Sequence, residues 1–454
     1  MKKHVDLLHG AILPTMMKLA IPIMATSLLQ MAYNLVDMIW LGRIGSGAVA
    51  AAGSAGMYIW LSAGIAALAK VGGQVKVGHS LGANKREDAI LYAQTSLQMG
   101  ILLGILFGAI CLVGAQPLIY FFKLNNADVM EGAIQYLRIC GGGIVFNFMI
   151  NIMTGIMMAM GNSTTPFRVT FVGLIVNMVL DPLFIFGIGP IPRMGVIGAA
   201  IATLLAQILS AVLMITAARK DKQIFSNIKL NSPIHMEYVK TMLRISCPTA
   251  LQSMMFTGIS MIIARLIAGW GDEAIAVQKV GSQIESISWM TADGFAAALG
   301  AFIAQNYGAN DLKRVRQGYV KAIRLMLIWG CFSTFLLVVF PGEIFRIFIT
   351  EAKVLPLGID YLRIIGYSQL FMCMEITAAG AFSGIGKTIP PSVEGVTLTA
   401  LRIPMAMVLG TTALGLNGIW WSISISSILK GIVLLLWFEI VLRRILSKER
   451  VTAN

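Results

Sequence analysis

Long apolar runs alternate with short clusters of glycine, proline and charged residues along the whole chain. Each run provides the roughly 20 residues that an α-helix needs to cross the hydrocarbon core of a bilayer. In the first half the predicted spans are 14–42, 48–70, 92–118, 133–160, 167–188 and 195–218. In the second half they are 245–269, 274–307, 318–345, 357–384, 391–412 and 416–442. The pattern therefore predicts twelve transmembrane helices.

The second half of the sequence repeats the first. At a separation of 226 residues, Pro22 matches Pro248 and Gly82-Ala83-Asn84 matches Gly308-Ala309-Asn310. Further along, the separation shortens to 225 and then to 220 residues. A period this long is far above the roughly 20 to 50 residues of solenoid repeats, so a whole helical bundle is duplicated.

The repeat defines two lobes of six helices each in an all-α integral membrane protein. We expect an N-lobe at 1–218, a polar linker at 219–244, a C-lobe at 245–442 and a tail at 443–454. The composition supports this class, because the mean hydropathy is +0.80 and 12% of the residues are charged. Soluble domains carry about 25% charged residues.

The net charge of +14 does not indicate a nucleic-acid-binding protein, because the basic residues alternate from loop to loop. The N-terminus, the even-numbered loops and the C-terminus hold 24 of the 35 lysines and arginines. The positive-inside rule places these segments, and both termini, on the cytoplasmic side of the plasma membrane. Each half then has an even number of spans, so a pseudo-twofold axis along the membrane normal relates the lobes.

The chain has no motif that indicates an enzyme. It lacks a phosphate-binding Gly-x-x-x-x-Gly-Lys-Ser/Thr loop and a His-Glu-x-x-His zinc motif. The five cysteines lie in or at apolar spans without paired spacing, and we expect them to be small buried side chains. Transport by such a chain would depend on an ion gradient rather than on nucleotide hydrolysis.

Five carboxylates fall inside the predicted spans, where an ionised group costs several kcal/mol or more. They are Asp37, Asp181, Glu285, Asp293 and Glu375. None has an acidic counterpart in the other half; the matching residues are Ile263, Ala406, Ile59, Ala67 and Ile150. A residue that only held the shared fold would recur in both halves, so the asymmetry favours a functional role.

Polar neighbours accompany two of these acids. Gln30, Tyr33 and Asn34 precede Asp37 at spacings that place all four on one helical face. Asn177 precedes Asp181 by one helical turn. Desolvation favours the neutral carboxylic acid, and oxygen ligands suit a hard ion, so Asp37, Asn177 and Asp181 could hold a proton or Na⁺.

Alternative interpretations stay open for each group. Asp37 could bind backbone donors, and Asp181, which precedes Pro182, could cap a broken helix. Glu285, Asp293 and Glu375 could line a water-filled vestibule or lie at helix ends. Pro22 and Pro248 could act as hinges or as fixed bends in the first span of each half.

The sequence resembles the multidrug and toxic compound extrusion (MATE) family over nearly its whole length. The resemblance depends on Pro22 with Tyr33-Asn34-Leu35-Val36-Asp37, the two Gly-Ala-Asn turns, Gly161-Asn162-Ser163-Thr164-Thr165-Pro166 and Asn177-Met178-Val179-Leu180-Asp181-Pro182. It implies that Tyr136, Asn151, Asn177, Asp181 and Thr203 join Asp37 in a cation site of the N-lobe. Family members often carry Arg-Gly-x-Gly-Asp where this chain has Ser383-Gly384-Ile385-Gly386-Lys387, and Glu375 lies near an acid of some relatives.

The resemblance implies an antiporter, coupled to H⁺ or Na⁺, that exports amphipathic and often cationic compounds by alternating access. We expect no cofactor besides the coupling ion, and no partners besides small-molecule substrates and the lipid bilayer. The alternative is a lipid-linked saccharide flippase, which would have extra spans and a cationic cavity. Apart from Arg265, Lys279, Arg402 and Lys430, the charged residues that we assign to the cavity are acidic.

Overall fold

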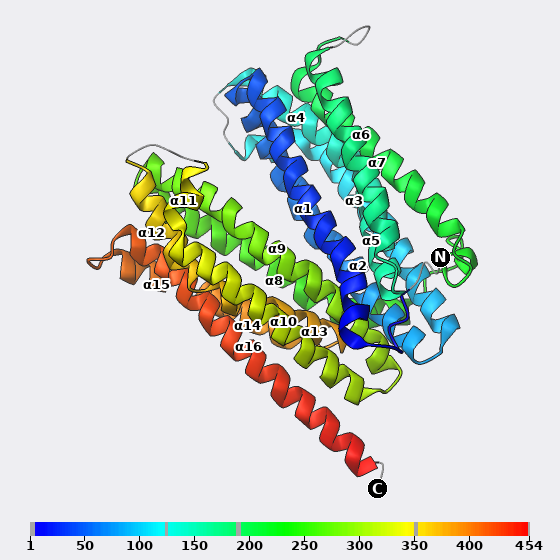
Figure 1. The fold of residues 1–454 in the computed structure, drawn as a ribbon. Coiled ribbons are helices and arrows are strands. Elements are labelled where there is room, and N and C mark those ends of the chain that lie inside the picture. The colour runs from blue at the N-terminus through cyan, green and yellow to red at the C-terminus, as the bar shows by residue number, and fades with distance from the viewer. Residues whose placement is uncertain (1–4, 123–125, 188–191, 349–352, 453–454) are drawn as a thin grey trace. The chain divides into compact units, whose positions relative to one another are not determined.

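The computed structural model describes residues 5–122, 126–187, 192–348 and 353–452, without the side chains of Asn34, Leu35, Met38, Ser46, Asp272, Ala276 and 448–452. Within these residues the regular secondary structure is helical throughout (Figure 1). The first half contains α1 (Ile12–Ile44), α2 (Ser46–Gly82), α3 (Arg86–Tyr120), α4 (Ala127–Gly142), α5 (Ile144–Ala159), α6 (Thr164–Phe186), α7 (Gly195–Arg219) and the short η1 (Phe225–Asn227). The second half contains α8 (Met236–Ala268), α9 (Asp272–Gly308), α10 (Leu312–Val339), α11 (Pro341–Arg346), α12 (Leu355–Gly366), α13 (Gln369–Gly384), α14 (Ile389–Ala400), α15 (Arg402–Gly410) and α16 (Leu416–Thr452). The all-α class is confirmed.

The helices follow the predicted spans closely. Ten helical segments of the described chain are long and apolar enough to cross a membrane, and the pair α4 and α5, bent by 45°, makes an eleventh. Their repeat counterparts α12 and α13 occupy the remaining predicted span. Two helices continue beyond the predicted spans that end at residues 70 and 442, since α2 reaches Gly82 and α16 reaches Thr452. Lysine is a good helix former, so charged residues mark the membrane edge without ending the helix.

The chain folds into two compact units. Unit 1 comprises Met1–Val5 with Ala25–Ala250, and unit 2 comprises Asp6–Met24 with Leu251–Asn454. The opening parts of α1 and α8 therefore belong to a different unit from the rest of each helix. The chain passes from one unit to the other after Met24 and again after Ala250. These two positions are 226 residues apart, so they correspond to each other in the repeat.

Specific contacts hold the segment before α1 in unit 2. Leu7 is buried, and its carbonyl oxygen accepts a hydrogen bond of 3.0 Å from Asn306 Nδ2. Arg314 donates to the carbonyl oxygen of His9 over 3.1 Å. Slight burial acts to raise the pKa of the Asp6 carboxyl, but hydrogen bonds from the His9 ring and from nearby backbone N–H groups lower that pKa overall.

The polar segment 219–244 packs against α3 of unit 1. Arg86 donates to the carbonyl oxygen of Gln223 over 2.8 Å, and Gln98 Nε2 donates to that of Ser232 over 2.7 Å. The end of the segment already forms the start of α8, where Ser246 Oγ accepts from the Gly72 backbone N–H at 2.8 Å. These contacts attach the opening part of α8 to unit 1.

The predicted Gly-Ala-Asn turns occur in both halves. Asn84 and Asn310 adopt left-handed backbone conformations with φ of 57° and 59°, which asparagine tolerates better than most residues. Asp311 Oδ1 then accepts from the Arg314 backbone N–H at 2.9 Å and caps α10. The corresponding N-cap of α3 is Lys85, which makes no such side-chain bond.

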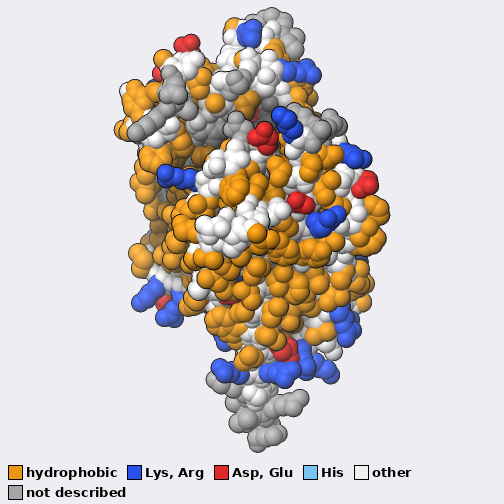
Figure 2. All heavy atoms as spheres, turned by 90° about the vertical axis from the view of Figure 1, so that its left-hand side faces the viewer, with side chains coloured by type: hydrophobic (Ala, Val, Ile, Leu, Met, Phe, Trp, Pro, Cys, Tyr) orange, Lys and Arg blue, Asp and Glu red, His pale blue; other side chains and the backbone are white. Residues whose placement is uncertain are grey.

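Each unit has its own apolar core and an apolar exterior. Phe148 and Leu137 are fully buried in unit 1, and Trp420 packs edge-on against Tyr361 in unit 2 with ring centroids 5.2 Å apart. On α10 of unit 2 the exposed side chains Ile328, Phe332, Phe335 and Val339 form a stripe at helical spacing. Figure 2 shows hydrophobic side chains over much of the visible face. Such a surface suits lipid rather than water.

The cysteines correct one expectation. Cys111, Cys140 and Cys373 are buried, but Cys247 on α8 and Cys331 on α10 are exposed. A weakly polar thiol behaves as a small hydrophobic group, so burial of a cysteine is not required to satisfy a strong hydrogen-bonding group.

We expect Gly198→Ala and Gly418→Ala to lower the midpoint of thermal unfolding in detergent. These glycines correspond in the repeat, and a Cβ would lie 2.4 Å from the Phe184 carbonyl oxygen in unit 1 and 2.3 Å from that of Leu409 in unit 2. Relieving such a clash requires a helix to move and costs about 1–3 kcal/mol. Differential scanning fluorimetry measures the shift. Gly53→Ala is the control, since its Cβ would meet nothing within 4 Å.

Candidate functional site

Asp181 and Asn177 form a buried polar pair on α6 of unit 1. Asp181 is fully buried and Asn177 is 2% exposed. Because they are one turn apart, Asn177 Nδ2 donates to Asp181 Oδ1 over 3.1 Å. Asp181 lies inside the helix, with Pro182 also inside it, so the alternative of a helix cap is wrong.

Asp37 of α1 lies close to this pair, within unit 1. Its carboxylate interacts electrostatically with that of Asp181. Tyr33, one turn before Asp37, interacts electrostatically with both carboxylates, and its hydroxyl lies near that of Thr203 on α7. Tyr136 of α4 is buried and also interacts with both carboxylates. Four helices thus bring two acids, an amide and three hydroxyl groups together.

Several oxygens of this group have no hydrogen-bond partner. They are Asp37 Oδ1, Asp181 Oδ2, Asn177 Oδ1 and Thr203 Oγ1, and each of these atoms is buried. Buried polar atoms are normally paired, and two neighbouring carboxylates repel each other. Binding of a single positive charge would relieve both costs, which makes the group a candidate site for a proton or a small hard cation.

Three further residues of the first half were predicted at the site, namely Asn151, Gln30 and Asn34, and the contacts described above do not include them. The described contacts of the Asn151 amide are with Asn147 on the same helix, to Oδ1 at 2.8 Å and to the carbonyl oxygen at 3.0 Å. Gln30 is exposed. The side chain of Asn34 lies outside the described residues.

The three acids of the second half differ in their surroundings. Glu375 of α13 forms an ion pair with Lys430 of α16, with Nζ and Oε1 2.9 Å apart. Glu285 of α9 interacts with Arg402 of α15. Asp293 is exposed on α9. Buried cations therefore accompany two of the three acids.

Sequence reasoning missed Glu394 of α14, which is 4% exposed and interacts with Glu375 and Lys430. It follows Pro390-Pro391 near the start of a span, where a solvated residue is expected. Its position inside the predicted span 391–412 was the feature of the sequence that could have indicated its burial. Arg402, which interacts with Glu285, corresponds to Asn177 in the repeat. Matching positions in the two units therefore both carry buried polar side chains.

The two prolines of the opening spans lie inside continuous helices. Pro22 is within α1 and Pro248 within α8. Each precedes by two residues the point where its helix passes from one compact unit to the other. A proline removes one backbone hydrogen bond of a helix, so these are positions where bending costs little.

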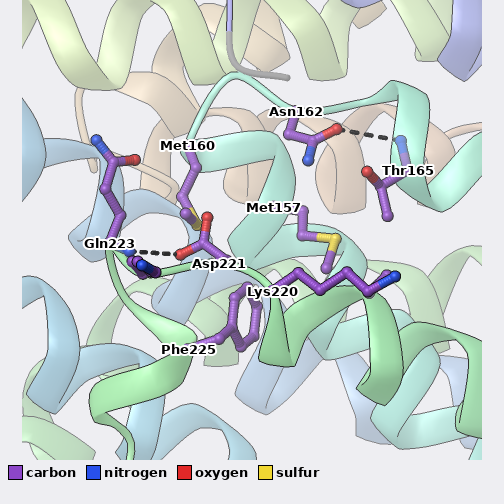
Figure 3. A pocket seen from close by; sticks show the side chains of 10 residues that line it. Met157, Met160, Asn162, Thr165, Lys220, Asp221, Gln223 and Phe225 are labelled. Atoms are coloured by element: carbon purple, nitrogen blue, oxygen red, sulfur yellow. Dashed lines mark hydrogen bonds between the residues drawn. The ribbon is translucent and has the colours of Figure 1, made fainter. Parts of the chain in front are cut away.

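Figure 3 shows a cavity elsewhere in unit 1, with a volume of about 280 Å³. Met157, Met160 and Phe225 contribute apolar side chains to its lining, and Lys220 and Lys222 also line it. None of the predicted coupling residues lines it. The carboxylate group around Asp37 and Asp181 therefore remains the candidate site on chemical grounds.

The fold and the site together define a class of protein. Charged side chains inside a bundle of membrane-spanning helices typically mark the path of an ion or a substrate. The model of the MatE family matches residues 22–183 and 248–408, more than half of the chain. The two matches begin at Pro22 and Pro248, once in each half of the repeat. The chain belongs to the MatE family, as the resemblance predicted.

Relatives align along almost the whole chain. The probable multidrug resistance protein NorM of Thermotoga maritima is 27% identical over 445 residues, which cover 96% of this chain and 95% of that protein. The probable multidrug resistance protein YpnP of Bacillus subtilis is 26% identical over 446 residues, with 96% and 97% coverage. A protein named FAD transporter, from Shewanella oneidensis, is 23% identical over 439 residues, with 95% coverage of both chains.

Solved structures share the fold. A multidrug resistance MATE family transporter of the MOP superfamily, in an outward-facing conformation, superposes with a TM-score of 0.89 at 25% identity, covering 98% of both chains. A MATE structure in the straight conformation gives the same TM-score and identity and covers 98% of this chain and 99% of the other. The twelve-helix, two-lobe prediction agrees with these neighbours.

Proposed function

We propose that this protein is an antiporter that exports amphipathic, often cationic compounds in exchange for H⁺ or Na⁺. The observation that carries the proposal is the pairing of Asp37 with Asp181, each with an oxygen that lacks a hydrogen-bond partner. Family membership and the names of the relatives support export of small molecules. The basic loops support a plasma-membrane protein with both termini in the cytoplasm.

In this proposal Asp37, Asn177 and Asp181 bind the coupling ion. A proton would neutralise one carboxylate, whereas Na⁺ would use the unpaired oxygens of all three residues as ligands. Tyr33, Tyr136 and Thr203 would hold the carboxylates in place. Asn151, Gln30 and Asn34 would contact substrate or support the site, and Glu285, Asp293 and Glu375 would be auxiliary.

Export requires the two lobes to alternate between inward and outward access. Pro22 and Pro248 would act as hinges, because a helix that joins two compact units must bend where it leaves one of them. One positive charge that moves inward through 100 mV supplies about 2.3 kcal/mol, enough for roughly fortyfold accumulation of a neutral exchange partner. For a neutral compound, the membrane potential is thus a sufficient energy source without nucleotide hydrolysis.

Efflux from vesicles that contain the purified full chain tests this function. We expect an imposed pH gradient or an imposed Na⁺ gradient to drive movement of a cationic dye against its concentration difference. Each gradient is imposed separately, so the result also identifies the coupling ion. Dye movement that follows only its own concentration difference under both gradients would contradict the proposal. A parallel assay with FAD tests the substrate that one relative's name suggests.

A further inference from the structure

Unit 2 contains a second buried cluster of charges. Its members come from five helices, α9, α13, α14, α15 and α16. They are Glu285, Glu375, Glu394, Arg402 and Lys430. Three carboxylates thus share the cluster with two cationic side chains, which leaves one carboxylate without a counter-charge.

Two of the carboxylates have clear partners. The Lys430–Glu375 pair is nearly enclosed, with side-chain exposures of 8% and 11%. Arg402 interacts with Glu285, whose carboxylate also lies near the side chain of Gln369. The Arg402 guanidinium donates in addition to two hydroxyl groups of α16, those of Ser426 and Ser427. Arg402 and Lys430 therefore each already have a carboxylate partner other than Glu394.

Glu394 is the carboxylate that remains. It is 4% exposed, and neither of its carboxylate oxygens has a hydrogen-bond partner. Its charged neighbours are Glu375, which would repel a negative charge, and Lys430, which would attract one. Gln252 of α8, whose side chain packs against Gly395, is neutral. A buried ionised carboxylate without donors is costly, and the neutral acid avoids that cost.

We propose that Glu394 is a proton-binding site, protonated while Lys430 is bonded to Glu375 and ionised when Lys430 bonds to Glu394 instead. Glu375, which loses its partner in that exchange, takes up the proton that Glu394 releases, so the cluster keeps one neutral carboxyl group and the same number of ion pairs. A proton suits the cluster better than Na⁺, because the neighbouring hydroxyl and carboxylate groups already serve Arg402 and Lys430. Among the described residues, no three His, Cys, Asp or Glu side chains are placed to hold a metal ion.

This site is separate from the Asp37–Asp181 pair and does not depend on it. Glu394 and its partners all belong to unit 2, whereas Asp37 and Asp181 belong to unit 1. A direct measurement of protonation, without transport, therefore tests the second site even if the coupling proposal for the first one fails.

Infrared difference spectroscopy of the purified full chain, titrated with acid and base in lipid nanodiscs, reports protonated carboxyl groups directly. We expect Glu394→Gln to remove one carboxylic-acid band that the unchanged protein shows at neutral pH. Asp37→Asn should retain this band. Glu343→Gln, at an exposed position on α11, is the matched control and should retain the band that is present at neutral pH.

Glu375→Gln provides an independent arm that does not alter Glu394. It frees Lys430 to pair with Glu394, so the Glu394 band should disappear at a lower pH than in the unchanged protein. This arm decides the question alone if Glu394→Gln does not fold. A spectrum of folded Glu394→Gln with every band retained, or a Glu375→Gln titration identical to that of the unchanged protein, would overturn the proposal.

Discussion

Asp37→Asn is expected to reduce gradient-driven efflux to the level of vesicles without protein, while the variant still reaches the membrane and binds substrate. The amide keeps the size of the side chain but cannot take up a proton and carries no negative charge for Na⁺. The Oδ1 atom of Asp37 is buried without a partner, so the side chain has no other evident task that an amide would disturb. Fluorescent dye efflux at a fixed gradient measures the effect.

The control for this experiment is Asp128→Asn. Asp128 is an exposed acid on α4 of the same unit, and its loss changes the overall charge equally. Efflux by this variant should match that of the unchanged protein. If Asp37→Asn transports dye at the unchanged rate, the coupling ion does not bind at Asp37.

Most of the fold could be predicted from the sequence because membrane spans are encoded locally. A run of about 20 apolar residues has to form a helix to satisfy its backbone in lipid. The repeat then related the halves and placed matching turns at Asn84 and Asn310. The assignment of Asp6–Met24 to unit 2 could not be predicted, because it depends on contacts such as that between Leu7 and Asn306, almost 300 residues apart.

The candidate site was predictable because a polar or charged side chain is conspicuous in an apolar run. Asp37, Asp181 and Asn177 met that condition, and the structure brings them together. The ion pair of Glu375 with Lys430 did not, since its members are 55 residues apart on different helices. Glu394 shows the same limit, because its burial depends on how neighbouring helices pack rather than on its place in the sequence.

Asp181→Asn is the second variant with a large expected effect, and it separates function from stability. It should lose gradient-driven efflux as Asp37→Asn does, because both carboxylates serve one site. Its midpoint of thermal unfolding should rise, since the new amide can donate to the unpaired oxygens of Asp37 and Asn177. One added buried hydrogen bond contributes about 1 kcal/mol. Efflux assays and differential scanning fluorimetry on the same preparation measure the two effects.

A rise in the unfolding midpoint without loss of efflux in Asp181→Asn would instead show that Asp181 is a structural residue. The coupling ion would then have to bind at Asp37 without it, and the unpaired Asn177 oxygen would have no role in coupling.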